Sequence, residues 1–418
     1  MSLLGAPLDR EQITALRKQY PDFRGDLPDE AKFWAKADVE KFMKSGGVTK
    51  PPQKAKKDVQ TCELLTRTRV KMAKEGISEP TDEYRSYCRR LKESGDVWRF
   101  PATAHCSEVA KVKVAPAALR APVIVEKQQE WKARMWNMDF CKKECGDHIW
   151  MCTSRSPFFE DDIKGVDTFE VEATIGEYIE YARLVQRMDR KCEEDSALAY
   201  PRVGLVGFPL FADRLSDLFR DVWKEMSPPG IRDLTHRWMG TFSRVCNVDW
   251  QEHLTLTYRL CLGSVGSIVR LHKEAAGAHV WLNQIEGRRV FFLFPPEDAE
   301  LLYANGTTGE SPVDVFYPSA KRHSKFSKAK AQGTILYLGQ TLVIPSGWFW
   351  YSVALEPSVT LEHPFWNEEN KARFAEGLWP HFDVPNLTPE MRQDVGRDID
   401  LVHEKIITGE DDDEDDDD

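Results

Sequence analysis

The chain has 418 residues, of which 41% are apolar and 30% are charged, and its formal net charge is −11. An apolar fraction of this size can bury a core and excludes wholesale disorder, and no run approaches the ~18 consecutive apolar residues of a membrane span. The first ten residues have neither a basic stretch nor a long apolar stretch, so we expect no secretory signal there.

Residues 1–110 are predicted to form a helical region. They contain no motif that we can name. Helices are expected over four ranges, with the basic, proline-containing linker 50–57 between the second and the third. These ranges are 9–20, 28–46, 58–76 and 81–95.

Four side chains of soft metal-ligand types follow within twelve residues, Cys141, Cys145, His148 and Cys152. Zinc prefers such ligands. Their spacing, however, follows one face of a helix, and neighbours on a straight helix face cannot close a tetrahedron around a metal. We therefore favour a buried helical stripe over a zinc site. The nine cysteines of the chain are odd in number and form no regular framework, which is typical of reduced thiols and predicts an intracellular protein of the nucleus or cytoplasm.

The middle of the chain changes from helical to strand-like patterns. We expect an extended segment over 115–125, helices over 175–190 and 212–226 with a strand over 200–209 between them, and a break at Pro228–Gly230. From 250 to 366 short β-rich runs are separated by Gly and Pro, which predicts a sandwich or barrel. The expected strands are 254–262, 267–271, 280–285, 289–294, 334–338, 341–344, 348–355 and 359–361.

Two charged segments stand out near the end of the chain. The basic insert Ser319–Gln332 predicts a mobile surface loop that contacts an acidic partner, folds back on the chain's own acidic tail or is simply solvated. After a last helix over 388–407, Glu410–Asp418 is nine consecutive acids, for which we expect a disordered tail that solubilises the protein or attracts a basic partner. Without the tail the chain carries 57 basic and 59 acidic residues, which gives no support for nucleic-acid binding as its main role.

His272 and Glu274 lie at the end of an apolar run that predicts a strand. Side chains two residues apart on a strand face the same way, and a histidine with a carboxylate forms two-thirds of a facial triad for non-haem Fe(II). Taken alone, the pair is a weak signal, because such pairs are common on protein surfaces.

The context of the pair is more specific. Gly287 follows, then Arg289 and an aromatic run that ends in Phe294-Pro295, and a later segment reads Pro345-Ser346-Gly347-Trp348-Phe349. This resembles the JmjC domain, a cupin-type jelly roll of Fe(II)/2-oxoglutarate oxygenases, and most closely the lysyl-hydroxylase branch once called phosphatidylserine receptor. The resemblance covers about 167–367, with its specificity in 263–296 and 334–366.

The resemblance implies an α+β protein built on a cupin-type double-stranded β-helix. We expect a helical region at 1–110, the JmjC-like domain with its extension at 111–366, a helical cap at 367–409 and the tail at 410–418. Apolar residues of the cap, among them Phe374, Ile399, Leu401 and Val402, either form a dimer contact or pack on the barrel.

Carried over to this chain, the resemblance makes His272 and Glu274 iron ligands, and it places Arg289 where the family holds the far carboxylate of 2-oxoglutarate. The third ligand position is occupied by Trp350, whose indole nitrogen carries a proton and offers no lone pair. Leu282 and Pro364 also stand where the hydroxylase branch is polar, so the cavity is expected to be dry and full. His363 or His279 could replace the missing ligand.

These residues support two main hypotheses. In the first, the chain is a catalytically impaired JmjC protein that needs no cofactor and acts as a protein-binding or scaffolding module. In the second, it is an active Fe(II)/2-oxoglutarate-dependent protein hydroxylase or demethylase with an unusual ligand set. A cupin of another kind is a third reading. The sequence does not name a substrate or partner.

Overall fold

The computed structural model describes residues 14–15, 18–20, 39–40, 43–44, 62–74, 103, 105–126, 135–154, 169–191, 204–209, 227–246, 257–316, 318–374 and 388–409. The chain divides into two compact units, one of Met1–Cys88 with Arg183–Pro201 and one of Arg89–Ala182 with Arg202–Asp418. In the first unit the expected helix over 58–76 is confirmed as α4 (Glu63–Lys74), with Leu64 and Leu65 buried. The helices expected over 81–95 and 212–226 and the acidic tail lie outside the described residues, as do most of those over 9–20 and 28–46.

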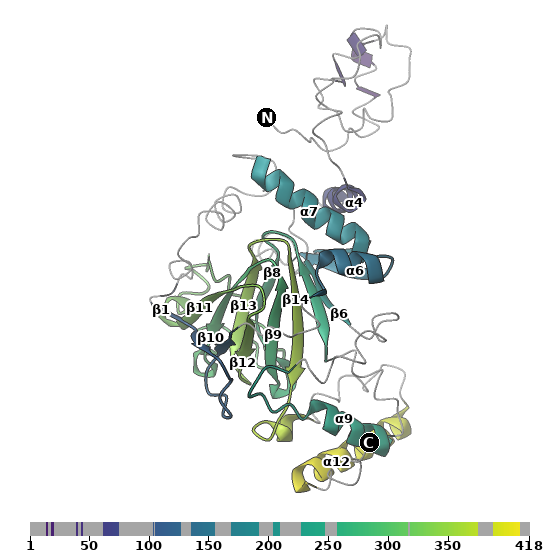
Figure 1. Cartoon of the computed structure of the whole chain (residues 1–418). Coiled ribbons are helices and arrows are strands. Elements are labelled where there is room, and N and C mark those ends of the chain that lie inside the picture. The colour runs from purple at the N-terminus through teal and green to yellow at the C-terminus, as the bar shows by residue number, and fades with distance from the viewer. Residues whose placement is uncertain are drawn as a thin grey trace. The chain divides into compact units, whose positions relative to one another are not determined.

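The second unit contains a barrel of two sheets, which confirms the cupin-type jelly roll (Figure 1). The smaller sheet has the order β1 (His105–Glu108), β11 (Lys330–Leu336), β10 (Arg289–Phe294), β13 (Phe349–Ala354), β8 (Ile268–Lys273). The larger sheet has the order β2 (Ala110–Val112), β3 (Val123–Val125), β12 (Thr341–Ile344), β9 (His279–Glu286), β14 (Ser358–Phe365), β7 (Arg259–Gly263), β6 (Gly204–Pro209), β4 (Ile149–Ser154), β5 (Phe169–Thr174).

Consecutive strands from β7 to β14 alternate between the two sheets, except for β10 and β11, which pair with each other in the smaller sheet. All eight of these strands were expected from the sequence, and β10 and β12 have the predicted bounds. Between the sheets lies an apolar core with side chains from both of them. Its buried members are Val109, Ile124, Val280, Leu282, Phe291, Leu293, Leu336, Leu342, Ile344, Trp348 and Trp350.

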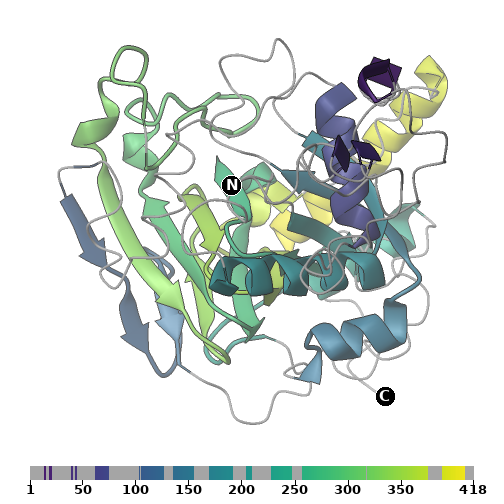
Figure 2. The same ribbon diagram turned by 90° about the horizontal axis from the view of Figure 1, so that it is seen from above.

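The segment before the barrel is the part that sequence analysis placed least well. Residues 105–112 were expected to be helical up to 110, but β1 pairs in parallel with β11, and β2 pairs in parallel with β3. In Figure 2 the blue strands of this segment run along the edge of the green barrel layer. Strands β4 and β5, which extend the larger sheet, were not predicted either.

Apart from the helix at Ile175–Lys191, which continues into the first unit, the helices of this unit lie at two ends of its barrel (Figure 1). Helix α6 (Met138–Cys145) begins at Asn137, whose side chain accepts a hydrogen bond from the Phe140 N–H, and α7 (Ile175–Lys191) confirms the helix expected over 175–190. Helix α9 (Thr235–Cys246), which sequence analysis missed, packs beside α12 (Pro389–Thr408), which it expected. Short 3₁₀ turns lie at Ala275–Gly277, Pro296–Asp298, Phe326–Lys328 and Lys371–Arg373.

The apolar face of the C-terminal cap is used within the chain. Phe374, Ile399 and Val402 pack in one buried cluster with Trp238 of α9 and with Trp366, just after β14. Of the two alternatives expected for these residues, a dimer contact or packing within the chain, the arrangement corresponds to the second. None of the helices in the described ranges is long and apolar enough to cross a membrane.

The expected Cys/His stripe does not lie on one helix. Helix α6 ends at Cys145, His148 lies in the following turn, and Cys152 lies on β4. Cys141, Cys145 and Cys152 are buried. Within the described residues, no group of three or more His, Cys, Asp or Glu side chains could hold a metal ion.

Candidate functional site

The candidate site lies inside the barrel at the end of β8, where the sequence placed it. His272 occupies the penultimate position of this strand, and Glu274 precedes the short 3₁₀ turn at Ala275–Gly277. Strand β13 runs antiparallel to β8, and its register sets Trp350 directly opposite His272. The residue that replaces the family's third ligand therefore faces the other two positions.

The indole of Trp350 fills the space beside the pair. Its Nε1–H donates a hydrogen bond to Glu274 Oε1 over 3.0 Å, and its ring centroid lies 4.4 Å from that of His272. His272 Nε2 lies 3.5 Å from the same carboxylate oxygen. Trp350 is 2% exposed and packs with Leu282 in the apolar core of the barrel.

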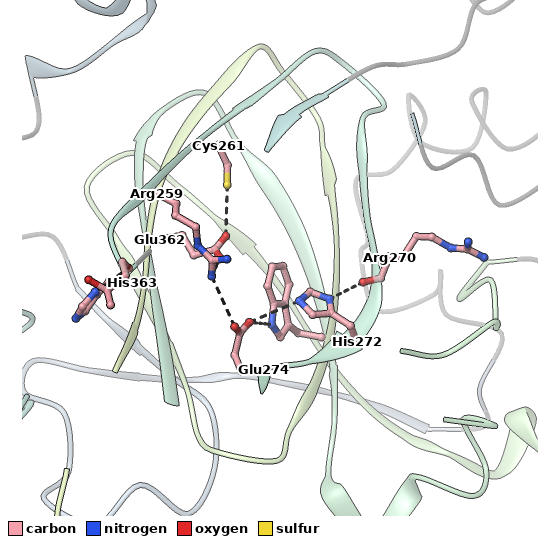
Figure 3. Close-up of polar contacts among 9 residues, drawn as sticks. Arg259, Cys261, Arg270, His272, Glu274, Glu362 and His363 are labelled. Carbon is pink, nitrogen blue, oxygen red and sulfur yellow. Dashed lines mark hydrogen bonds and ion pairs between the residues drawn. The ribbon is translucent and has the colours of Figure 1, made fainter. Parts of the chain in front are cut away.

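Arg259 completes the set of donors around Glu274. Its Nη2 lies 3.7 Å from Glu274 Oε2 and 2.5 Å from Glu362 Oε1 on β14. The thiol of Cys261 donates to the other oxygen of Glu362 over 3.3 Å. Figure 3 shows the resulting chain of contacts, with Glu274 between the Arg259 guanidinium and the His272 ring. An indole N–H and a guanidinium thus surround the carboxylate that would bind a metal.

The contacts of His272 favour its protonated form. Its Nδ1 lies 2.8 Å from the carbonyl oxygen of Arg270, and its Nε2 faces the Glu274 carboxylate. Both partners are acceptors, so a ring that carries a hydrogen on each nitrogen suits this position. Burial acts to lower the pKa of His272, but the hydrogen bond and charge of Glu274 outweigh it and raise that pKa above 6.5.

The pKa of Glu274 moves in the opposite direction. Burial would raise the pKa of this carboxyl, but His272, the Arg259 charge and the Trp350 hydrogen bond lower it below 4.5. The carboxylate is therefore ionised, with its charge compensated by groups of the chain itself.

The residues present do not fit a facial iron site. Fe(II) needs a lone pair from each ligand, and the Trp350 nitrogen offers only an N–H. The Arg259 guanidinium would in addition repel a dication at the Glu274 carboxylate.

Arg289 does lie in a setting that suits a carboxylate ligand. It is buried on β10, its Nη2 donates to the hydroxyl of Ser352 over 2.9 Å, and it forms no salt bridge within the described residues. Burial lowers the pKa of this guanidinium, although an arginine stays charged. A side chain at Gly263 would collide with Arg289 Nη1 and with the buried, unpartnered hydroxyl of Ser358, so glycine leaves room there.

His363 and His279, the two replacement ligands considered from the sequence, have other partners. His363 Nε2 lies 2.7 Å from Asp233 Oδ2, and its Nδ1 lies 2.8 Å from the carbonyl oxygen of Thr257. His279 Nδ1 accepts a hydrogen bond from the Ser346 N–H over 3.0 Å. Figure 3 shows His363 directed away from the His272–Glu274 pair, so the structure does not bring these histidines together.

Sequence reasoning missed Arg259, Glu362 and Asp233. A charged residue within an apolar strand run is the signal that was available for Arg259 and Glu362, because these charges interrupt buried segments. Their pairing depends on the register of β14 with β7, which sets Glu362 opposite Arg259.

Comparisons with known proteins agree with this fold. A family model described as a cupin-like domain matches residues 111–372. HSPB1-associated protein 1 of Homo sapiens is 26% identical over 269 residues, 60% of this chain and 48% of that protein. Its homolog in Danio rerio is 26% identical over 292 residues, 64% of this chain and 56% of that protein. Lysine-specific demethylase 8 of Xenopus tropicalis is 32% identical over 114 residues, 27% of this chain and 25% of that protein. The chain thus spans about half the length of the HSPB1-associated relatives.

Proposed function

Since the chain belongs to the cupin-like domain family of JmjC type, we propose that it is a member without oxygenase activity that acts as a protein-binding or scaffolding module. The lysyl-hydroxylase branch remains a prediction from the sequence. The proposal also places the protein inside the cell, in the nucleus or cytoplasm, where thiols stay reduced.

One observation carries this proposal, the hydrogen bond from Trp350 Nε1 to Glu274 Oε1. An indole in this position supplies a proton where an imidazole would supply an electron pair. It also fills a volume next to His272 that an ion and its remaining ligands would need.

The electrostatics of the interior support the same conclusion. Glu274 needs a positive partner because an isolated carboxylate in a buried site is costly. Arg259 supplies that charge, and His272 adds to it when it is protonated. The site is therefore electrically satisfied without a metal.

A cupin-like domain without oxygenase activity can serve in protein association, and the names of the relatives support this role. Two of them are named for association with HSPB1. We propose that this chain likewise binds a partner protein of that kind. Binding of the purified chain to purified human HSPB1, measured by isothermal titration calorimetry, tests this part. Absence of binding would contradict the proposal that this chain binds HSPB1.

Metal binding and turnover test the loss of oxygenase activity. The wild-type chain is expected to hold no stoichiometric Fe(II) under anaerobic titration and to leave 2-oxoglutarate intact. Trp350→His should gain Fe(II) affinity, because it restores a lone pair opposite His272. Adding Arg259→Gln should increase the gain, because it removes the positive charge beside Glu274.

The matched control is Trp348→His. It adds a histidine two residues earlier in the chain, at a position that is not paired with His272. It should bind no more Fe(II) than the wild type. Stoichiometric Fe(II) in the wild type, together with decarboxylation of 2-oxoglutarate, would overturn the proposal.

An active Fe(II)/2-oxoglutarate-dependent hydroxylase or demethylase is the second candidate function. The observation that favours it is Arg289, a buried guanidinium without a carboxylate partner in the described residues. If 2-oxoglutarate binds there but is not consumed, calorimetry will detect binding that Arg289→Met abolishes, and the first proposal stands. Turnover that Arg289→Met abolishes would establish the second.

A further inference from the structure

A segment that the proposed function does not use presents five basic side chains to solvent. We call these residues, Lys321, Arg322, Lys325, Lys328 and Lys330, the basic ridge. All five are exposed, although the segment that carries them is packed against the barrel. The sequence predicted a mobile loop here, and the structure instead gives turns, the 3₁₀ turn at Phe326–Lys328 and the start of β11.

Every third residue of this segment points inward. His323, Phe326 and Ala329 are buried, whereas the two residues between each of them are exposed. The cause is a series of hydrogen bonds between residues three apart. The Phe326 N–H donates to His323 O over 3.0 Å, and the Ala329 N–H donates to Phe326 O over 2.9 Å. Such turns have three residues per turn, so the outward positions are fixed in direction.

The segment is also anchored to its neighbours. The Phe326 ring centroid lies 5.7 Å from that of Phe294, at the end of β10. The backbone N–H of Lys330 donates to Asp298 Oδ2 over 2.6 Å, and that of Lys325 donates to the Tyr303 hydroxyl over 3.1 Å. The charges of the ridge are therefore displayed by an ordered support, and a ligand would not have to order the backbone first.

The four lysines of the ridge lack compensating carboxylates in the described residues. Lys321, Lys325, Lys328 and Lys330 form no ion pair within the part of the chain that the structure describes. Asp298 contacts this segment, but its carboxylate is buried and accepts a hydrogen bond from the backbone N–H of Lys330. A row of like charges held at fixed spacing repels itself and attracts a flexible chain of opposite charge.

We propose that the basic ridge binds an acidic peptide segment, and that Glu410–Asp418 is the segment that occupies it, from the same chain or from a second copy. The argument is charge complementarity, since these nine residues are all acidic and most of the excess negative charge of the chain lies in them. A nucleic-acid backbone fits less well, because the rest of the chain is nearly neutral and does not attract a long polyanion.

The test measures binding of a fluorescent peptide of the sequence EDDDEDDDD. The protein is a full-length variant in which the nine acids are Asn or Gln, so that its own segment does not compete with the peptide. Anisotropy should report binding that weakens with added salt. Reversal of three ridge charges, Lys321→Glu with Lys325→Glu and Lys328→Glu, should weaken it by about tenfold or more, because exposed ion pairs contribute up to about fivefold each. The matched control reverses Lys111, Lys142 and Lys143, which are also exposed.

Zero-length carbodiimide crosslinking of the wild type provides a measurement that does not depend on any variant. Crosslinks between ridge lysines and Glu410–Asp418 should appear in the monomer band if the segment folds back, and in a dimer band if a second copy supplies it. Both results support the proposal. Absence of such crosslinks, equal peptide binding by the ridge and control variants, or tighter ridge-dependent binding of a DNA 20-mer than of the peptide would overturn it.

Discussion

The two faces of strand β14 each contribute a residue to an ion pair, and the two pairs differ in burial and in what they contact. On the barrel side, Glu362 contacts Arg259, whose guanidinium reaches on to Glu274 and the candidate site. On the outer side, His363 contacts Asp233 over 2.7 Å, and its ring stacks on Tyr258 with centroids 3.7 Å apart. Adjacent residues of a strand face opposite sides, so one strand contributes to both pairs.

The residues of the outer pair have structural partners. Both nitrogens of His363 already have a partner, the carbonyl oxygen of Thr257 and the Asp233 carboxylate. Asp233 lies just before α9 and also accepts from the Thr235 N–H, so the pair fixes this helix to the sheet. The comparison teaches that the outer pair is a structural element, whereas the inner pair sets the charge of the site and decides which ligands the barrel can accept.

The largest effect is expected from His363→Leu, which leaves the Asp233 carboxylate buried without its partner. Breaking a buried ion pair from one side costs about 4 kcal/mol, and the two side chains are 0% and 4% exposed. Urea unfolding measures the loss. The control is Arg288→Ala, in an exposed pair with Glu356, for which less than about 1 kcal/mol is expected. Equal losses in the two variants would refute a structural role for the outer pair.

Arg259→Met should cost slightly less, about 3 kcal/mol, because it strands the Glu362 carboxylate while the Arg259 side chain itself is 30% exposed. The double variant Arg259→Met with Glu362→Leu should recover part of this loss, since it removes the stranded Glu362 carboxylate while Glu274 still lacks Arg259. A double variant no more stable than the single one would show that the pair is not coupled. Urea unfolding again provides the measurement.

Trp350→Phe separates the hydrogen bond from the packing at the inner site. It keeps an aromatic ring in place but removes the donor to Glu274, for which we expect a loss of about 2 kcal/mol. Trp348→Phe, which changes the same kind of side chain without that bond, should lose less. If both variants unfold at the same urea concentration, the indole contributes by volume alone.

The smallest effect concerns acid. Burial would raise the pKa of Asp233, but the charge and hydrogen bond of His363 lower it below 3.8. The unfolded chain therefore binds this proton at a higher pH than the native chain, and the associated stability is present above pH 3.8 and lost as the pH falls further. Asp233→Asn should remove this component, on the order of 1 kcal/mol between pH 5 and pH 3. Parallel pH profiles of the two proteins would contradict the assignment.

Much of the barrel was predictable because each of its strands is a short apolar run with turn residues at its ends. Gly287, for example, lies between β9 and β10 with a φ of 71°, a conformation that glycine adopts at no cost. Helix α9 was missed because its sequence mixes Thr, Gly and Ser with aromatic residues, and its helical state depends on packing with α12.

The candidate site was predictable only in part, for a similar reason. His272, Glu274 and Trp350 could be placed by resemblance, because their positions follow from strand ends and a turn. Arg259 could not, because its role depends on contacts with Glu274 and Glu362, which lie far from it in sequence. Such contacts arise from the register of paired strands, which local sequence does not specify.

The eight residues from His105 to Val112 have a consequence for anyone who trims this chain. Their first half is β1, the outermost strand of one sheet, their second half is β2, the outermost strand of the other, and Val109 between them is buried in the barrel. A version that starts at residue 113 would expose unpaired backbone donors and acceptors on β11 and β3 at once, and bare edges of this kind recruit neighbouring molecules. Shortened versions for biochemistry should therefore begin upstream of His105 if they are to stay in solution.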